Sequence, residues 1–158
     1  MTTVAAIKLL TFVESVWLAF LAMREDPRGK TNAAFVRYIL FVAAACLVEF
    51  LMVTSPTAPV FLFWKHFDVF MFFAVPAFFQ FSLMLGGHPW ASGRRFNVML
   101  YGSATFIGLL EGFGMRPLGA VPGRWSFVAQ YPQPYWTVHL IVLVVASAMA
   151  LATVVELY

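Results

Sequence analysis

Charged residues are scarce in this sequence. Only 11% of its 158 residues are Asp, Glu, Lys or Arg and 62% are hydrophobic, whereas a soluble domain carries about 25% charged residues. The apolar residues come in long blocks and do not alternate with polar ones, which excludes the strand pattern of a transmembrane β-barrel. The sequence therefore predicts an all-α fold, a polytopic bundle of transmembrane helices.

Several other features are missing. Cys46 is the only cysteine, so an intramolecular disulfide is excluded, and no Cys/His metal spacing is present. The net charge of +3 reflects few acids and no basic cluster, so nucleic acid is not an expected partner. There is no G-x-S-x-G, no phosphate-binding glycine loop and no H-E-x-x-H. We therefore expect no enzymatic activity.

Five apolar blocks approach or exceed the roughly 20 residues that cross a hydrocarbon core about 30 Å thick. They predict helices at residues 4–23, 33–54, 60–85, 96–113 and 135–156. We interpret the first as a retained helix and not a signal peptide, because Glu14 interrupts it and no small-residue cleavage site follows. Residues 114–134, rich in Gly, Pro and interfacial aromatics, are expected to cap the outer end of a single transmembrane domain.

The distribution of Lys and Arg predicts the orientation. One side of the expected bundle holds six of them, namely Arg24, Arg28, Lys30, Arg37, Arg94 and Arg95. The other side holds Lys8, Lys65, Arg116 and Arg124. By the positive-inside rule the first side is cytoplasmic, the N-terminus is outside and the C-terminus is inside. We expect a multi-pass protein of the bacterial inner (cytoplasmic) membrane.

The titratable residues within the predicted helices gather in the outer half of the membrane. Counted from the outer helix ends, they lie about 3 to 15 Å deep. They are Glu14, Glu49, Lys65, Asp68, Glu111 and His139. The inner half is expected to hold no such group apart from Glu156 at the chain end.

Charges inside a bilayer are costly, so these residues are expected to face inward and to be paired. Lys65 can meet Asp68 three residues later, or reach Glu49 across a short turn. Acids outnumber bases, so some carboxyls would be protonated or hydrated. The group can be a polar network that fixes helix neighbours, a pocket for a small molecule or an ion, or part of a proton pathway.

Two further motifs have alternative interpretations. His66 and His139 can ligate a haem or a chlorophyll-type macrocycle, although a lone membrane histidine is more often a hydrogen-bonding residue and the sequence requires no cofactor. Gly108 and Gly112 form a G-x-x-x-G motif that can contact a partner helix or pack within the chain. Pro76 is expected to kink the third helix.

Three stretches carry a resemblance to a known family: "AFVRYILFVAAACLVEFLM", "LFWKHFDVFMFFAVPAFFQFSLMLGG" and "GRWSFVAQYPQPYW". They resemble the N-terminal seven-helix sensor region of membrane histidine kinases. The resemblance implies an outside N-terminus and an input from a ligand or from the state of the membrane. Two further helices and the kinase output of that family have no counterpart here. We expect a non-catalytic membrane subunit that contacts other integral membrane proteins and lipid, with the sensor input as the alternative.

Overall fold

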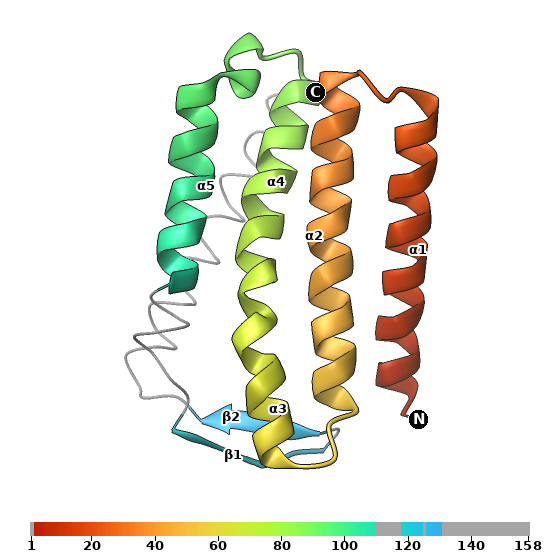
Figure 1. Ribbon diagram of the computed structural model, residues 1–158, viewed down its shortest axis with the longest axis vertical. Coiled ribbons are helices and arrows are strands. Elements are labelled where there is room, and N and C mark those ends of the chain that lie inside the picture. Colours follow the sequence, from red (N-terminus) through yellow and green to blue (C-terminus); the bar gives the residue numbers. More distant parts are fainter. Residues whose placement is uncertain (1, 110–117, 125, 131–158) are drawn as a thin grey trace.

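Antiparallel helical segments stand side by side in the computed structural model (Figure 1). The structure describes residues 2–109, 118–124 and 126–130. The helices in chain order are α1 (Thr3–Glu25), α2 (Lys30–Val53), α3 (Ala58–Lys65), α4 (Phe70–Leu85) and α5 (Arg94–Leu109). α1 packs on α2, α2 on α4, and α4 on α5. Helix α1 therefore forms one edge of the described part.

Three segments of the described residues are long and apolar enough to cross a membrane. They are Thr3–Glu25, Lys30–Val53 and Ala58–Leu85. The chain is mostly helical, as the sequence predicts. The expected fourth helix, residues 96–113, overlaps α5, which is described as far as Leu109, and the expected fifth, residues 135–156, lies outside the described residues.

The third span is not one regular helix. A 3₁₀ segment, η1 (His66–Val69), separates α3 from α4. Helix α4 continues through Pro76, and the 3₁₀ segment before it is a change in helix geometry that the sequence did not predict. In a 3₁₀ turn, side chains three residues apart lie in line, which places Lys65 directly over Asp68.

Short connections close the end of the bundle where α1 meets α2 and α4 meets α5, hereafter the loop end. The carboxylate of Asp26 accepts hydrogen bonds from the backbone N–H groups of Arg28 at 3.3 Å and Gly29 at 2.9 Å, which fixes the first turn. After α4, Gly87 takes a φ of 75°, a left-handed conformation that glycine adopts without steric cost. A second 3₁₀ segment, η2 (Pro89–Ser92), then leads into α5.

A β-hairpin crosses the opposite end, hereafter the hairpin end (Figure 1). Strands β1 (Gly119–Pro122) and β2 (Phe127–Gln130) are antiparallel, with Gly119 opposite Gln130. The Phe127 ring lies 5.9 Å from that of Phe61 in α3, and the Ser126 hydroxyl donates to the Met52 carbonyl at 2.8 Å. These contacts attach the hairpin to α2 and α3, in a region where the sequence analysis expected a loop without strands.

Small residues of α1 line its contact with α2. The buried positions of α1 are Ala5, Ser15 and Ala19, and those of α2, which packs on both α1 and α4, are Ala34, Val36, Ala43, Ala45 and Val48. Because such side chains are short, the two backbones approach closely and gain dispersion contacts along their length. Most of the large apolar side chains of α1 consequently point away from α2.

Candidate functional site

Two ion pairs lie toward the hairpin end. Lys65 at the end of α3 pairs with Asp68 in η1, the partner that the three-residue spacing predicts. Both side chains are largely buried, so each charge offsets part of the other's desolvation. This pair joins the end of α3 to the 3₁₀ turn that follows it.

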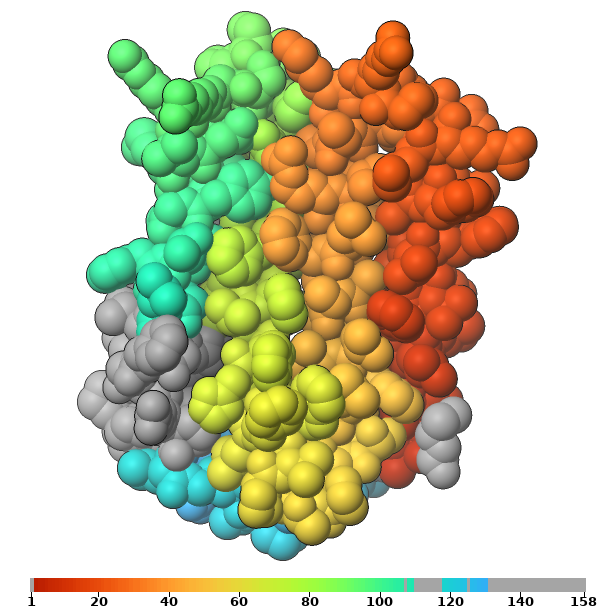
Figure 2. Space-filling model, in the orientation of Figure 1, coloured from red at the N-terminus to blue at the C-terminus, as the bar shows by residue number. Residues whose placement is uncertain are grey.

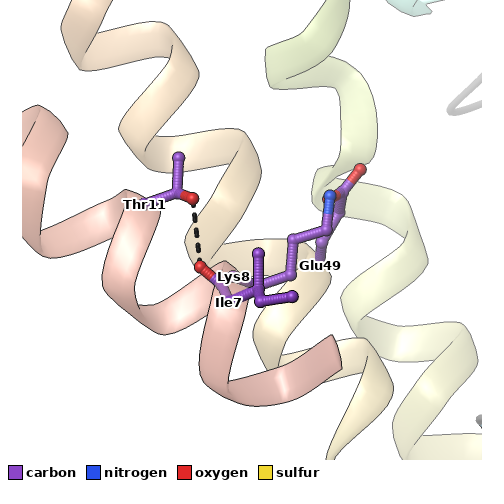
Figure 3. Close-up of polar contacts among 4 residues, drawn as sticks. All are labelled: Ile7, Lys8, Thr11 and Glu49. Carbon is purple, nitrogen blue, oxygen red and sulfur yellow. Dashed lines mark hydrogen bonds and ion pairs between the residues drawn. The ribbon is translucent and has the colours of Figure 1, made fainter. Parts of the chain in front are cut away.

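The second pair joins two helices. Lys8 of α1 reaches across to Glu49 of α2 and forms an ion pair with it (Figure 3). The sequence also allowed Lys65 as a partner for Glu49. In the structure, Glu49 forms its ion pair with Lys8. The sequence used Lys8 only to predict the orientation of the bundle. In the structure Lys8 lies inside α1. With Lys8 included, the two described pairs balance two bases against two acids.

Of the expected cluster, Glu49, Lys65 and Asp68 lie together with Lys8 toward the hairpin end, where Asp68 is close enough to interact electrostatically with Lys8. Glu14 lies on an exposed face of α1 and makes no hydrogen bond or ion pair with any residue that the structure describes. Glu111 and His139 lie outside the described residues. Three of the four described members therefore belong to two neighbouring ion pairs, which Lys8 completes. The fourth, Glu14, lies at the middle of a membrane-length helix with no partner among the described residues.

His66 is exposed at the start of η1. Its Nδ1 lies 2.7 Å from the Leu62 carbonyl oxygen, and since a carbonyl only accepts, the hydrogen is on Nδ1. The Nε2 atom, on the other side of the ring, is then directed away from the helix backbone. Its expected co-ligand His139 is outside the described residues, and within residues 2–109, 118–124 and 126–130 no three His, Cys, Asp or Glu side chains come together as metal ligands do.

A polar network toward the loop end was not predicted. Gln80 of α4, only 3% exposed, lies at its centre. The Gln80 Oε1 accepts from Arg37 of α2 at 2.6 Å and from the Tyr101 hydroxyl of α5 at 2.8 Å. The Gln80 Nε2 donates to the Ala91 carbonyl at 3.2 Å and to Asn97 of α5. One amide thus connects α2, α4, η2 and α5.

This network corrects the expectation that the inner half holds no charged group within the helices. The sequence assigned Arg37 only to the basic side of the bundle; because α2 begins at Lys30, Arg37 lies about two turns inside the helix. Gln80 and Asn97 were overlooked because only titratable residues were counted. Uncharged amides inside long apolar blocks are the signal that could have located the network, since a buried amide needs partners.

Gly108 packs within the chain. It is buried, and a Cβ at this position would overlap the Cγ2 of Val69 in η1. This is the second of its two interpretations, close packing between α5 and the third span. Gly112 lies outside the described residues.

Searches for similar proteins add no relative. The chain matches no family model, no curated protein and no solved structure. The resemblance to histidine kinase sensor regions therefore stays an expectation carried by the quoted stretches.

The described polar groups are suited to holding helices in position. Ion pairs connect α1 to α2 and α3 to η1, and the Gln80 network connects α2 to α4 and α5. In a low-dielectric setting such contacts are costly to separate. The outer face of α1 carries Glu14, an acid with no partner among the described residues.

Proposed function

We propose that the chain is a non-catalytic integral membrane subunit that acts through helix–helix contacts in a larger membrane complex. In this proposal it forms a five-helix bundle in the bacterial inner membrane, with the N-terminus outside and the C-terminus cytoplasmic. The six Lys and Arg residues at the loop end support that orientation. The observation that carries the proposal is the pattern of residues on α1.

Helix α1 has two opposite faces with the same spacing. The face against α2 contains Ala5, Lys8, Phe12, Ser15 and Ala19. The opposite face contains Ile7, Leu10, Glu14, Trp17 and Leu21, all exposed, with Trp17 at 59%. Steps of three and four residues are those of a helix–helix seam. Since α1 lies at the edge of the described part (Figure 2), its second seam is open to another helix.

Glu14 distinguishes this face from an ordinary lipid-facing one. It lies near the middle of the 23-residue helix, where an acid costs at least about 2.5 kcal/mol even on the lenient insertion scale. Lipid tails offer it no donor. A partner helix with Lys, Arg or a neutral hydrogen-bond donor at the same depth removes most of this cost, because polar groups in membranes associate across helices. The partner is therefore another integral membrane protein, with lipid around the rest.

Purification from native membranes in mild detergent tests the proposal. We expect a second membrane protein in stoichiometric amount with the wild-type chain. Glu14→Leu removes the polar group that needs the partner, so the complex is lost while the isolated chain melts at the same or a higher temperature. Val16→Ala, exposed but outside the seam, is the matched control and retains the partner. A monodisperse wild-type monomer with no partner contradicts the proposal.

The second candidate is a ligand-sensing input domain, and the ion pairs near the hairpin end favour it. Lys8 and Glu49 are part-exposed, so a polar small molecule entering beside the hairpin can compete for them. The expected result is a specific compound that raises the thermal midpoint of the wild-type chain and not of Glu49→Gln. The absorption spectrum of the same sample tests for a haem or chlorophyll-type macrocycle, with His66→Leu as the control.

A further inference from the structure

Arg37 carries a positive charge that the described chain does not neutralise. Its guanidinium donates to the neutral Gln80 amide at 2.6 Å and lies 5.6 Å from the centre of the Tyr101 ring. It has no carboxylate partner among the described residues. Arg37 is nevertheless exposed, whereas Gln80 is buried. The contacts to Gln80 and Tyr101 hold the charged group in place and leave further guanidinium donors for an anion.

More cations surround this position. Lys30 is seven residues before Arg37 on α2, and Arg94 is seven residues before Tyr101 on α5, so each pair shares a helix face about 10 Å apart along the axis. Because Arg37 contacts Tyr101, these two faces converge, and Lys30 and Arg94 lie above Arg37 at the helix ends. The loop end thus carries an excess of positive charge around one fixed guanidinium.

The two described acids at the same end, Glu25 and Asp26, do not offset this charge at Arg37. They lie at the end of α1 and in the turn after it. The Asp26 carboxylate accepts hydrogen bonds from the backbone of its own turn. Helix α1 contacts α2 on the side away from α4 and α5 (Figure 1). Among the described residues, therefore, no carboxylate lies beside Arg37 and Tyr101.

We propose that Arg37 binds the phosphate of an anionic phospholipid in the leaflet at the loop end. A guanidinium presents paired N–H donors that match phosphate oxygens, and Lys30 and Arg94 add attraction for a headgroup with net negative charge. Leu40, one turn further into the membrane on α2, is 47% exposed and offers an apolar surface to an acyl chain. Inorganic phosphate has no acyl chain, so it would make no contact with this apolar surface. The site does not depend on the proposed subunit function.

Thermal unfolding in neutral detergent tests this site with three probes. Added phosphatidylglycerol raises the midpoint of the wild-type chain, whereas phosphatidylcholine and inorganic phosphate at the same concentrations leave it unchanged. Arg37→Gln weakens phosphatidylglycerol binding about tenfold, because one charge-assisted contact is lost. Arg95→Gln is the control, since Arg95 is exposed at the same helix end and is not part of the Arg37 contacts; its response stays within about twofold of wild type.

Arg37→Lys keeps the positive charge but removes the paired N–H donors of the guanidinium. We therefore expect an intermediate response to phosphatidylglycerol even if Arg37→Gln does not fold. Native mass spectrometry of the wild-type chain should retain phosphatidylglycerol in preference to phosphatidylcholine. Equal stabilisation by both lipids overturns the proposal. A response to inorganic phosphate equal to that of the lipid overturns the lipid as the ligand. If Arg37→Gln and Arg95→Gln lose phosphatidylglycerol binding equally, Arg37 is not the binding site.

Discussion

Gly108 of α5 lies against Val69 of η1 with no room for a side chain between them. The contact joins η1, the 3₁₀ turn described within the third span, to helix α5. It explains why glycine occupies position 108 of α5, since glycine within a helix is otherwise less favourable than alanine by about 1 kcal/mol. Close packing of this kind determines how near α5 can come to the preceding span.

Replacing Gly108 by alanine is therefore expected to destabilise the chain. The added methyl group forces Val69 or α5 to shift, and such overpacking costs about 1 to 3 kcal/mol. Gly102→Ala is the matched control, because a Cβ there meets nothing within 4 Å and alanine favours the helix. Thermal unfolding in detergent should give a lower midpoint for Gly108→Ala and an unchanged or higher one for Gly102→Ala. Equal midpoints would contradict the contact.

The Lys8–Glu49 pair predicts a coupled effect between α1 and α2. Lys8→Met leaves the Glu49 carboxylate without its partner and is expected to cost about 1 to 3 kcal/mol. The double variant Lys8→Met, Glu49→Gln should recover part of this loss, because neither charge then remains. A double-mutant cycle measures the coupling. Additive effects of the two substitutions would mean that the two side chains do not interact.

The Lys65–Asp68 pair makes a local prediction. Lys65→Met is expected to lower the thermal midpoint more than Arg28→Met, since Arg28 is an exposed turn residue whose charge contributes about 0 to 1 kcal/mol. Lys65→Met combined with Asp68→Asn should restore part of the midpoint. If Lys65→Met and Arg28→Met have the same midpoint, the pair is hydrated and adds little to stability.

Single-cysteine labelling tests the predicted orientation once Cys46 has been replaced by serine. A cysteine at Ser92, exposed at the loop end, should react only from the cytoplasmic side. Val128 in the hairpin is 53% exposed and is the labelling position for the opposite side. Ser126 is less suitable, because its hydroxyl bonds to Met52. A cysteine there should react only from outside. The reverse labelling pattern would invert the orientation without changing the packing.

The contrast between the two ion pairs shows what the sequence can predict. Lys65 and Asp68 are three residues apart, so local geometry brings them together wherever the helix lies. Lys8 and Glu49 are 41 positions apart, and they meet only because α1 packs on α2 in one register. Helix-length apolar blocks predict that such helices exist, but not which faces they present to each other.

The Gln80 network was missed for a related reason. Its members come from α2, α4 and α5 and none pairs with an opposite charge, so charge counting along the sequence gives no sign of it. The hairpin at residues 119–130 was also missed, because two four-residue strands are too short for an alternation signal. Their position depends on the tertiary contact between Phe61 and Phe127.

Crosslinking from the open face of α1 in native membranes tests the central claim most directly. A photoreactive benzoylphenylalanine at Trp17, on the exposed seam, should give one discrete product with another membrane protein, and the same probe at Val16 should give only lipid adducts. Adding Glu14→Leu to the Trp17 probe should abolish the product. Lipid adducts alone from both positions, or a product with the mass of two copies of this chain, would contradict the claim that α1 docks a different membrane protein.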